Sequence, residues 1–233
     1  MNFHLPRYLR FATVGVSLAV SAASAGAAGA NPHPGIRAIL GAQPIDHLEA
    51  STTALVIIDF QKEYFSGRLP IPDGRRALAQ AQRLVAFADQ ARMPVFQVQH
   101  VAPAGSALFA ADGDTVSFEP GMLPRPQDTV LRKQTVSVFA STDLDRRLKT
   151  LGVKTVIVAG LMTHACVAGA ARDAVPLGYH VVIASDASAT RDIVRADGQK
   201  VDKDALHRAA LAEIEDTFGD VMTTADITRL PLR

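Results

Sequence analysis

The stretch that decides the fold runs from Val153 to Ala174 and reads VKTVIVAGLMTHACVAGAARDA. An apolar run, Thr155–Ala159, stops at Gly160, and Cys166 then opens a run rich in alanine and valine. This order predicts a buried strand, a tight turn and the start of a helix. The only cysteine of the protein falls at the predicted turn.

The place of Cys166 indicates a reactive thiol. Backbone N–H groups at the start of a helix lack internal partners, and the helix dipole puts partial positive charge there. A thiol in such a place is shifted toward thiolate, the form that attacks carbon. The alternative is a small, inert side chain buried in the core. The sequence around Cys166 therefore leaves two interpretations, and possible partners elsewhere in the chain decide between them.

The first 30 residues differ in composition from the rest. Arg7 and Arg10 precede an apolar stretch, Phe11–Val20, and Ser21–Ala30 is nearly all Ala, Ser and Gly. A positive end, a short apolar segment and a run of small residues are typical of a secretory signal. The apolar segment is too short to span a membrane. We therefore expect residues 1–30 to be a signal peptide and the mature protein to be exported, periplasmic or secreted, without stable membrane insertion.

Export sharpens the meaning of the single cysteine. Proteins in oxidising compartments use cysteines in pairs, so one unpaired cysteine is buried and inert, joined to another chain or kept for its reactivity. The net charge of +1, the absence of tryptophan and 6% aromatic residues argue against nucleic acid as a partner. A small molecule is the expected ligand.

Apolar runs alternate with amphipathic segments along the rest of the chain. We expect strands at Thr53–Ile58, Val95–Val98, Asp128–Leu131, Thr155–Ala159, His180–Ala184 and Val221–Thr223. We expect helices at Arg75–Arg92, from Ser141 or Thr142 to Leu151, from Cys166 to Gly178, at Ala205–Thr217 and at Thr224–Leu230. This alternation predicts an α/β fold with a mainly parallel sheet covered on both faces.

Three segments are expected to lack regular structure. Residues Asn31–Ala50 form an extended lead-in to a single domain over residues 51–233. Val101–Gln127 is irregular and holds four prolines, and a loop of this length in a compact domain is commonly functional. We expect it to cover the site, and Asp192–Lys203 to form a polar loop.

Three reactive residues fall at the ends of predicted strands. Asp59 follows the first strand, Lys133 the third and Cys166 the fourth. In a parallel sheet the carboxyl ends of the strands lie at one edge, where ligands bind. A carboxylate, an amine and a thiol that are far apart in the sequence can therefore converge at that edge.

Their chemistry would suit amide hydrolysis. Cys166 would attack carbon, and Asp59, its pKa raised by apolar neighbours, would accept the thiol proton and deliver it to the leaving nitrogen. Lys133 would hold both groups in register, and backbone N–H groups of the Gly160–Cys166 turn would stabilise the oxyanion. An aspartate after a strand also caps turns, and a lone lysine is commonly a surface residue, so these alternatives stay open.

The same residues resemble a known family. The motifs are LVIIDFQKEYF around Asp59, VLRKQTVSVFASTDLDRRL around Lys133, and GLMTHACVAGAARDA followed by YHVVIASDASATRD around Cys166. They look like the isochorismatase-like cysteine hydrolases, which include nicotinamidases and N-carbamoylsarcosine amidases. The resemblance covers about residues 50–225 and rests on three separated motifs in the same order.

The resemblance implies a Rossmann-like, three-layer α/β/α domain with a six-stranded sheet. It implies a catalytic triad of Asp59, Lys133 and Cys166, a cis peptide at Leu161–Met162, and oxyanion donors in the N–H groups of Met162 and Cys166. It also implies a homo-oligomer. Because true isochorismatases often lack this cysteine, Cys166 favours hydrolysis of a C–N bond over cleavage of a vinyl ether.

One departure from the family concerns metal. Nicotinamidases carry an Asp-x-His pair after the second strand, where this chain reads VQHVAPAGSALF with a single histidine, His100. One histidine does not make a metal site, so we expect no metal and no cofactor. Weaker candidates for a substrate pocket are Phe65, His100, Phe118, His164 and Thr190.

The sequence thus predicts a cysteine amidohydrolase that acts on a small amide or carbamoyl compound through a thioester. Two alternatives remain: an isochorismatase-type or ester hydrolase that uses the same pocket, and a catalytically idle binding protein with the same fold.

Overall fold

The computed structural model describes residues 33–233. Residues 34–233 form one compact unit. The predicted signal peptide, residues 1–30, lies outside the described residues. Within residues 33–233, no helix combines the length and the apolar character needed to cross a membrane.

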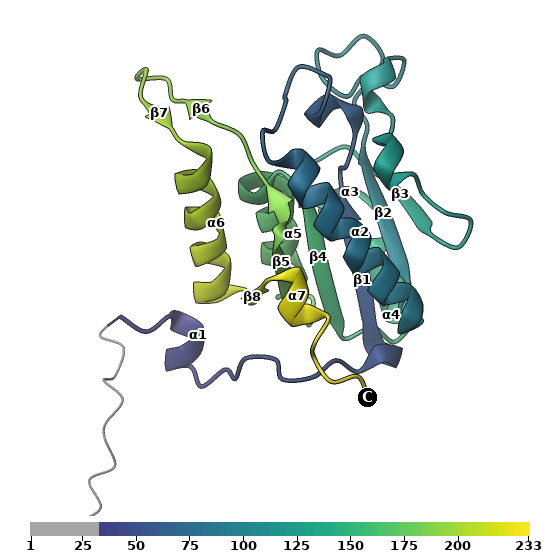
Figure 1. Cartoon of the computed structure of the whole chain (residues 1–233), viewed down its shortest axis with the longest axis vertical. Coiled ribbons are helices and arrows are strands. Elements are labelled where there is room, and N and C mark those ends of the chain that lie inside the picture. The colour runs from purple at the N-terminus through teal and green to yellow at the C-terminus, as the bar shows by residue number, and fades with distance from the viewer. Residues whose placement is uncertain (1–32) are drawn as a thin grey trace, which may run out of the picture. The chain divides into compact units, whose positions relative to one another are not determined.

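Six strands form the central sheet (Figure 1), in the order β3-β2-β1-β4-β5-β8. Their bounds are β1 Thr53–Ile58, β2 Val95–His100, β3 Thr129–Lys133, β4 Thr155–Leu161, β5 His180–Ala189 and β8 Asp220–Met222. Every neighbouring pair is parallel. The prediction of an α/β fold with a mainly parallel six-stranded sheet is confirmed.

Helices cover both faces of the sheet (Figure 1). They are α1 Ile36–Ile39, α2 Gly74–Gln90, α3 Val138–Ser141, α4 Leu144–Thr150, α5 Ala168–Ala174, α6 Lys203–Thr217 and α7 Thr224–Ile227. Side chains of α2 and α7 share one apolar core with one face of the sheet. Side chains of α3, α4, α5 and α6 share a second core with the other face. The domain therefore has three layers.

Strand β1 shows why the two cores form. All six of its residues are buried. Leu55 and Ile57 pack into the core under α2, whereas Val56 and Ile58 pack into the core on the opposite face. Successive side chains of a strand point to opposite faces, so a continuous apolar run is what a strand between two helical layers requires.

The structure corrects several predicted bounds. Strand β5 continues to Ala189, five residues beyond the predicted end at Ala184. The expected polar loop Asp192–Lys203 contains a short antiparallel hairpin, β6 Ile193–Val194 and β7 Lys200–Val201. The segment was not predicted as a hairpin because its polar residues show no alternation of apolar and polar side chains.

Helical bounds also differ from the prediction. The helix expected from Ser141 or Thr142 to Leu151 is α4, which begins only at Leu144, where Leu144 N donates to the Thr142 hydroxyl at 3.2 Å, and the separate short helix α3 precedes it. Helix α5 ends at Ala174, before Gly178. The lead-in expected to be extended contains α1, whose Ile36 N donates to Asp216 at 2.8 Å.

The order of the strands places the site. The chain passes from β1 outward through β2 to β3, then crosses back to β4 on the other side of β1. The crevice between β1 and β4 is therefore a switch point, where ligands bind in such sheets. Gly160 lies beside Ile58 there, and a Cβ on Gly160 would come within 2.5 Å of the Ile58 carbonyl oxygen. Glycine thus allows β1 and β4 to approach closely beneath the site.

Candidate active site

Asp59 is the first residue after β1. Its backbone has φ 56°, in the left-handed region, which Asp tolerates better than a β-branched residue does. Its side chain is fully buried. Lys133 Nζ lies 2.8 Å from Oδ2, and hydrogen bonds with Lys133 and Cys166 partly offset the rise that burial causes in the pKa of Asp59. The Asp59 carboxylate therefore adjoins the thiol whose proton it could accept.

Lys133 ends strand β3 and is also fully buried. Its Nζ lies 2.8 Å from Asp59 Oδ2 and 3.3 Å from Cys166 Sγ. The structure thus brings the three residues predicted for the triad together, with the Lys133 ammonium in contact with both the carboxylate and the sulfur. A buried charge needs such a partner.

Cys166 lies within a single π-helical turn, Thr163–Val167, that joins β4 to α5. The sequence placed it at the start of an α-helix, so the prediction is wrong by two residues: α5 begins at Ala168. The thiol is 5% exposed. The peptide bond between Leu161 and Met162, just before this turn, is cis.

The expected low pKa of the Cys166 thiol is wrong. Burial, and secondarily the negative charge of Asp59, raise the pKa of Cys166 to about 12, although Lys133 opposes them. Burial also raises the pKa of Asp59, and Lys133 counteracts this. Desolvation penalises the charged form of both acids and outweighs the field of the turn. The resting sulfur therefore carries its proton, and a base must remove it before the sulfur can attack.

His100 also contacts the triad. It ends strand β2, opposite Lys133 in the register of β2 and β3. Its Nδ1 is 2.8 Å from Lys133 Nζ. Burial, together with the charge of Lys133, lowers the pKa of His100 to about 4. At neutral pH the imidazole is therefore uncharged and its Nδ1 can accept a hydrogen bond from the ammonium.

The match to known proteins agrees with this geometry. Residues 53–226 match the sequence profile of the isochorismatase domain. The chain belongs to the isochorismatase family.

Relatives support a hydrolase of this family. The secreted isochorismatase effector Isc1 of Verticillium dahliae is 33% identical over 191 residues, which cover 82% of this chain and 97% of Isc1. A maleamate amidohydrolase of Pseudomonas putida is 29% identical, over 74% of this chain and 84% of the relative. A solved isochorismatase of Pseudomonas putida superposes with a TM-score of 0.78 at 32% identity, covering 84% of this chain and 99% of that one.

The other predicted pocket residues of this isochorismatase-family chain lie in different places. His164 Nδ1 is 2.7 Å from the Thr190 hydroxyl, which joins the turn of Cys166 to the end of β5. Phe118 forms a backbone bridge with Gln61, so its loop lies against the segment that follows Asp59. Phe65 packs at the start of α2, with the Arg75 guanidinium 5.1 Å from its ring centre. Their roles in substrate binding stay predictions.

Three residues near the triad were missed by the sequence analysis. Tyr64 is 2% exposed, and burial, with the charges of Cys166 and Asp59, raises its pKa above the ordinary value. Phe109, from the long loop expected to cover the site, packs against Tyr64 and against His100, with ring centres 5.3 and 4.9 Å apart. Tyr64 could have been found from its place five residues after Asp59, whereas nothing in the sequence marks Phe109.

Arg191 is the third. Its Nε atom is buried and has no hydrogen-bond partner among the described residues. Its charge acts on His164, whose pKa burial and Arg191 together lower, and also on Tyr64. The guanidinium therefore lies near two side chains that adjoin the triad. A correct end for β5 would have placed Arg191 at the carboxyl edge of the sheet.

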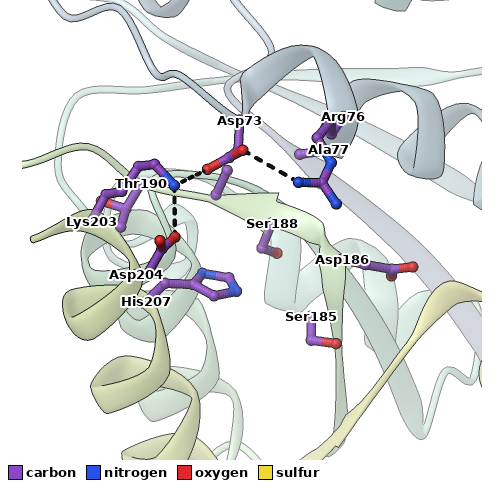
Figure 2. A pocket seen from close by; sticks show the side chains of 11 residues that line it. Asp73, Arg76, Ala77, Ser185, Asp186, Ser188, Thr190, Lys203, Asp204 and His207 are labelled. Atoms are coloured by element: carbon purple, nitrogen blue, oxygen red, sulfur yellow. Dashed lines mark hydrogen bonds and ion pairs between the residues drawn. The ribbon is translucent and has the colours of Figure 1, made fainter.

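A polar hollow of about 190 Å³ is lined by His207 and Thr190, whose side chains hydrogen-bond to the turn that holds Cys166 (Figure 2). Figure 2 shows His207 and Ser188 facing it, with Lys203 bridging Asp73 and Asp204 at its rim. His207 Nδ1 is 2.8 Å from the hydroxyl of Thr163 in that turn. The lining of this hollow includes none of the three triad residues, so the hollow is separate from the triad.

Metal binding has no support among the described residues. Over residues 33–233, no three His, Cys, Asp or Glu side chains are grouped so that they could hold an ion. His100, the histidine at the place of the nicotinamidase metal site, instead faces Lys133. A cation beside the Lys133 ammonium would be repelled.

We expect chelation to leave turnover unchanged, because the candidate chemistry needs no Lewis acid. The measurement is hydrolysis after dialysis against EDTA, compared with protein dialysed against buffer alone. Activity that is lost with EDTA and returns on adding Zn²⁺ or Fe²⁺ would restore a metal site.

Proposed function

We propose that this protein hydrolyses the C–N bond of a small amide that carries a carboxylate, with Cys166 as nucleophile. The observation that carries the proposal is the buried Lys133 ammonium, 2.8 Å from Asp59 and 3.3 Å from the Cys166 sulfur. A nucleophile, a base and a cation that orients both are the parts that acyl transfer through a thiol requires.

The first half of the reaction forms a thioester. Asp59 takes the proton of Cys166, and Sγ attacks the carbonyl carbon while the carbonyl oxygen gains negative charge. The N–H groups of Met162 and Cys166 are the proposed donors to that oxygen. Asp59 then gives its proton to the amide nitrogen, the C–N bond breaks, and ammonia or an amine leaves.

The second half uses water. Asp59 takes a proton from water, whose oxygen attacks the thioester carbon; the C–S bond then breaks and the sulfur regains the proton. The raised pKa of Asp59, caused by burial, suits a group that must take up a proton and give it away again within each half. Lys133 takes no proton in these steps and stays in contact with both the Asp59 carboxyl group and the Cys166 sulfur.

Arg191 is the residue that favours a substrate with a carboxylate. Its Nε is buried with nothing to bind, and a guanidinium matches a carboxylate with two parallel hydrogen bonds. A relative named maleamate amidohydrolase is consistent with hydrolysis of an amide in this family. The test is an ammonia-release screen over small amides, ureas and carbamoyl compounds in matched pairs with and without a carboxylate, such as succinamate against butyramide.

We expect Arg191→Gln to raise KM for carboxylated amides by about 10- to 100-fold, because a charge-assisted hydrogen bond contributes about 1.5–3 kcal/mol. The same variant should leave neutral amides unaffected. Arg195→Gln is the matched control, because Arg195 is exposed in the β6–β7 hairpin and pairs with Asp197 at 2.9 Å. An equal loss on both substrate classes would argue against the carboxylate.

A second candidate function is isochorismatase activity, favoured by the 33% identity to Isc1. Ammonia release separates the two, since cleavage of a vinyl ether produces none. We further propose that the protein is exported, supported by residues Arg7–Ala30 of the sequence and by its similarity to Isc1, a secreted effector. N-terminal sequencing of the mature protein tests this, with cleavage expected after Ala25 or Ala30.

A further inference from the structure

The surroundings of Lys133 Nζ hold more acceptors than the triad alone supplies. Besides Asp59 Oδ2 and Cys166 Sγ, His100 Nδ1 lies at 2.8 Å and the Thr135 carbonyl oxygen at 3.2 Å. An ammonium has three N–H donors on a flexible four-carbon stem. The direction in which the Lys133 ammonium points therefore depends on which of its acceptors are fixed. Apart from the contact with Asp59, its shortest contact is with His100 Nδ1.

His100 is itself held from several sides. Its backbone N–H donates to Gln61 Oε1 at 2.8 Å, and its carbonyl oxygen accepts from Gln61 Nε2 at 2.8 Å. Its ring packs against Phe109, whose centre is 4.9 Å away. Phe109 has φ 53°, an uncommon conformation for a bulky residue that persists only where surrounding contacts hold it. The imidazole is therefore a fixed acceptor, unlike a surface histidine.

The chemistry of the contact sets the state of the ring. Because the ammonium can only donate, Nδ1 must be the unprotonated nitrogen and Nε2 must carry the hydrogen. The charged group that acts on the ring is Lys133, from β3, and the Asp59 carboxyl group, which pairs with that ammonium, also adjoins the backbone of His100. Burial and Lys133 hold the pKa of His100 near 4, so the accepting form persists at neutral pH.

We propose that His100 is a positioning residue that aims the Lys133 ammonium at Asp59 and at the Cys166 sulfur. His100 touches neither reacting atom. Its contribution is to remove rotational freedom from the Lys133 side chain, so that the positive charge stays 3.3 Å from Sγ. The proposal concerns the site of the proposed hydrolase but needs no substrate for its test.

The test uses the only cysteine of the protein as its own reporter. Alkylation by iodoacetamide, followed as a function of pH, measures thiolate formation at Cys166 alone. Lys133 lowers the pKa of Cys166, so a lysine that is no longer aimed at the sulfur makes the thiolate harder to form. His100→Phe keeps a ring against Phe109 but removes the acceptor, whereas His100→Asn keeps an acceptor near the place of Nδ1.

We expect His100→Phe to move the alkylation curve upward by about one pH unit, which is about tenfold in rate on the rising limb. His100→Asn should stay close to the wild-type curve. His180→Phe is the matched control, because His180 is exposed at the amino end of β5. Coincident curves for wild type and His100→Phe would overturn the proposal, and equal shifts for Phe and Asn would show a merely structural role.

A second measurement uses the wild-type protein, so it does not depend on whether a variant folds. The ¹⁵N shifts of the assigned His100 imidazole in the full-length wild-type protein should show Nδ1 unprotonated and Nε2 protonated down to about pH 4. Protonation of that ring near pH 6.5, or the opposite tautomer, would overturn the proposal. Failure to hydrolyse any amide would instead refute the proposed function while leaving both readouts intact.

Discussion

We expect Cys166→Ala to lower kcat for amide hydrolysis by about 10³-fold or more, because the thioester cannot form without the sulfur. Cys166→Ser should be similarly inactive. A serine hydroxyl has a higher pKa than a thiol, and the apolar surroundings that already raise the pKa of Cys166 to about 12 would raise that of serine further. The measurement is ammonia release on the best substrate of the screen.

The fold should survive both substitutions. Cys166 is buried beside small residues of α5, and removing one sulfur atom costs far less than a large-to-small change in a core. Urea unfolding of the variants should therefore give nearly the wild-type midpoint. Turnover by well-folded Cys166→Ala would end the assignment of the nucleophile and return the isochorismatase-type mechanism to first place.

The second large effect is on stability. Lys133→Met should lower the free energy of unfolding by about 3–5 kcal/mol at pH 8, because it leaves the Asp59 carboxylate buried without a positive partner. Both side chains are fully buried in the wild type. The double variant Asp59→Asn with Lys133→Met removes both charges and should recover much of the loss. The measurement is urea unfolding of the wild type, the two single variants Lys133→Met and Asp59→Asn, and the double variant.

The deficit of Lys133→Met should depend on pH with a defined sign. Burial raises the pKa of Asp59 and Lys133 lowers it, so without Lys133 only the raising effect remains. A carboxyl whose folded pKa exceeds its unfolded value binds more protons when folded, so stability falls as pH rises. The deficit should be small below about pH 4 and grow above it.

A surface pair supplies the control for this experiment. Lys149 Nζ lies 2.9 Å from Asp145 across one turn of α4, and its side chain is 56% exposed. Lys149→Met should change stability by no more than about 0.5 kcal/mol. If the Lys133 double variant loses as much as the two single variants combined, the pair is uncoupled and the argument from burial is wrong.

Most helices and strands of the fold could be predicted from local patterns in the sequence. The apolar run of β1 and the amphipathic stripe of α2 identified these elements within a few residues. The prediction was wrong where contacts between distant parts of the chain decide where a strand or helix ends. Strand β5 continues to Ala189 because it pairs with β4 beyond a register shift at Gly160, and no local pattern records that partner.

The candidate site was likewise predictable only in part. The ends of predicted strands marked Asp59, Lys133 and Cys166 as candidates, the family resemblance implied that they form a triad, and the structure brings them within contact distance. The thiol pKa was predicted with the wrong sign, since the argument used the local dipole of the turn and could not include burial. Arg191 and Phe109 were missed because their approach to the triad depends on the paths of β5 and the long loop.

The sequence by itself determined which segments are strands, that the sheet is parallel, and which reactive side chains stand at its carboxyl edge, because these depend on the periodicity of neighbouring residues. Only the tertiary structure decided that Lys133 contacts both Asp59 and Cys166, that His100 accepts from it, and that the sulfur rests protonated. Strand order and desolvation depend on contacts between residues far apart in the chain, and a sequence pattern read locally does not contain them.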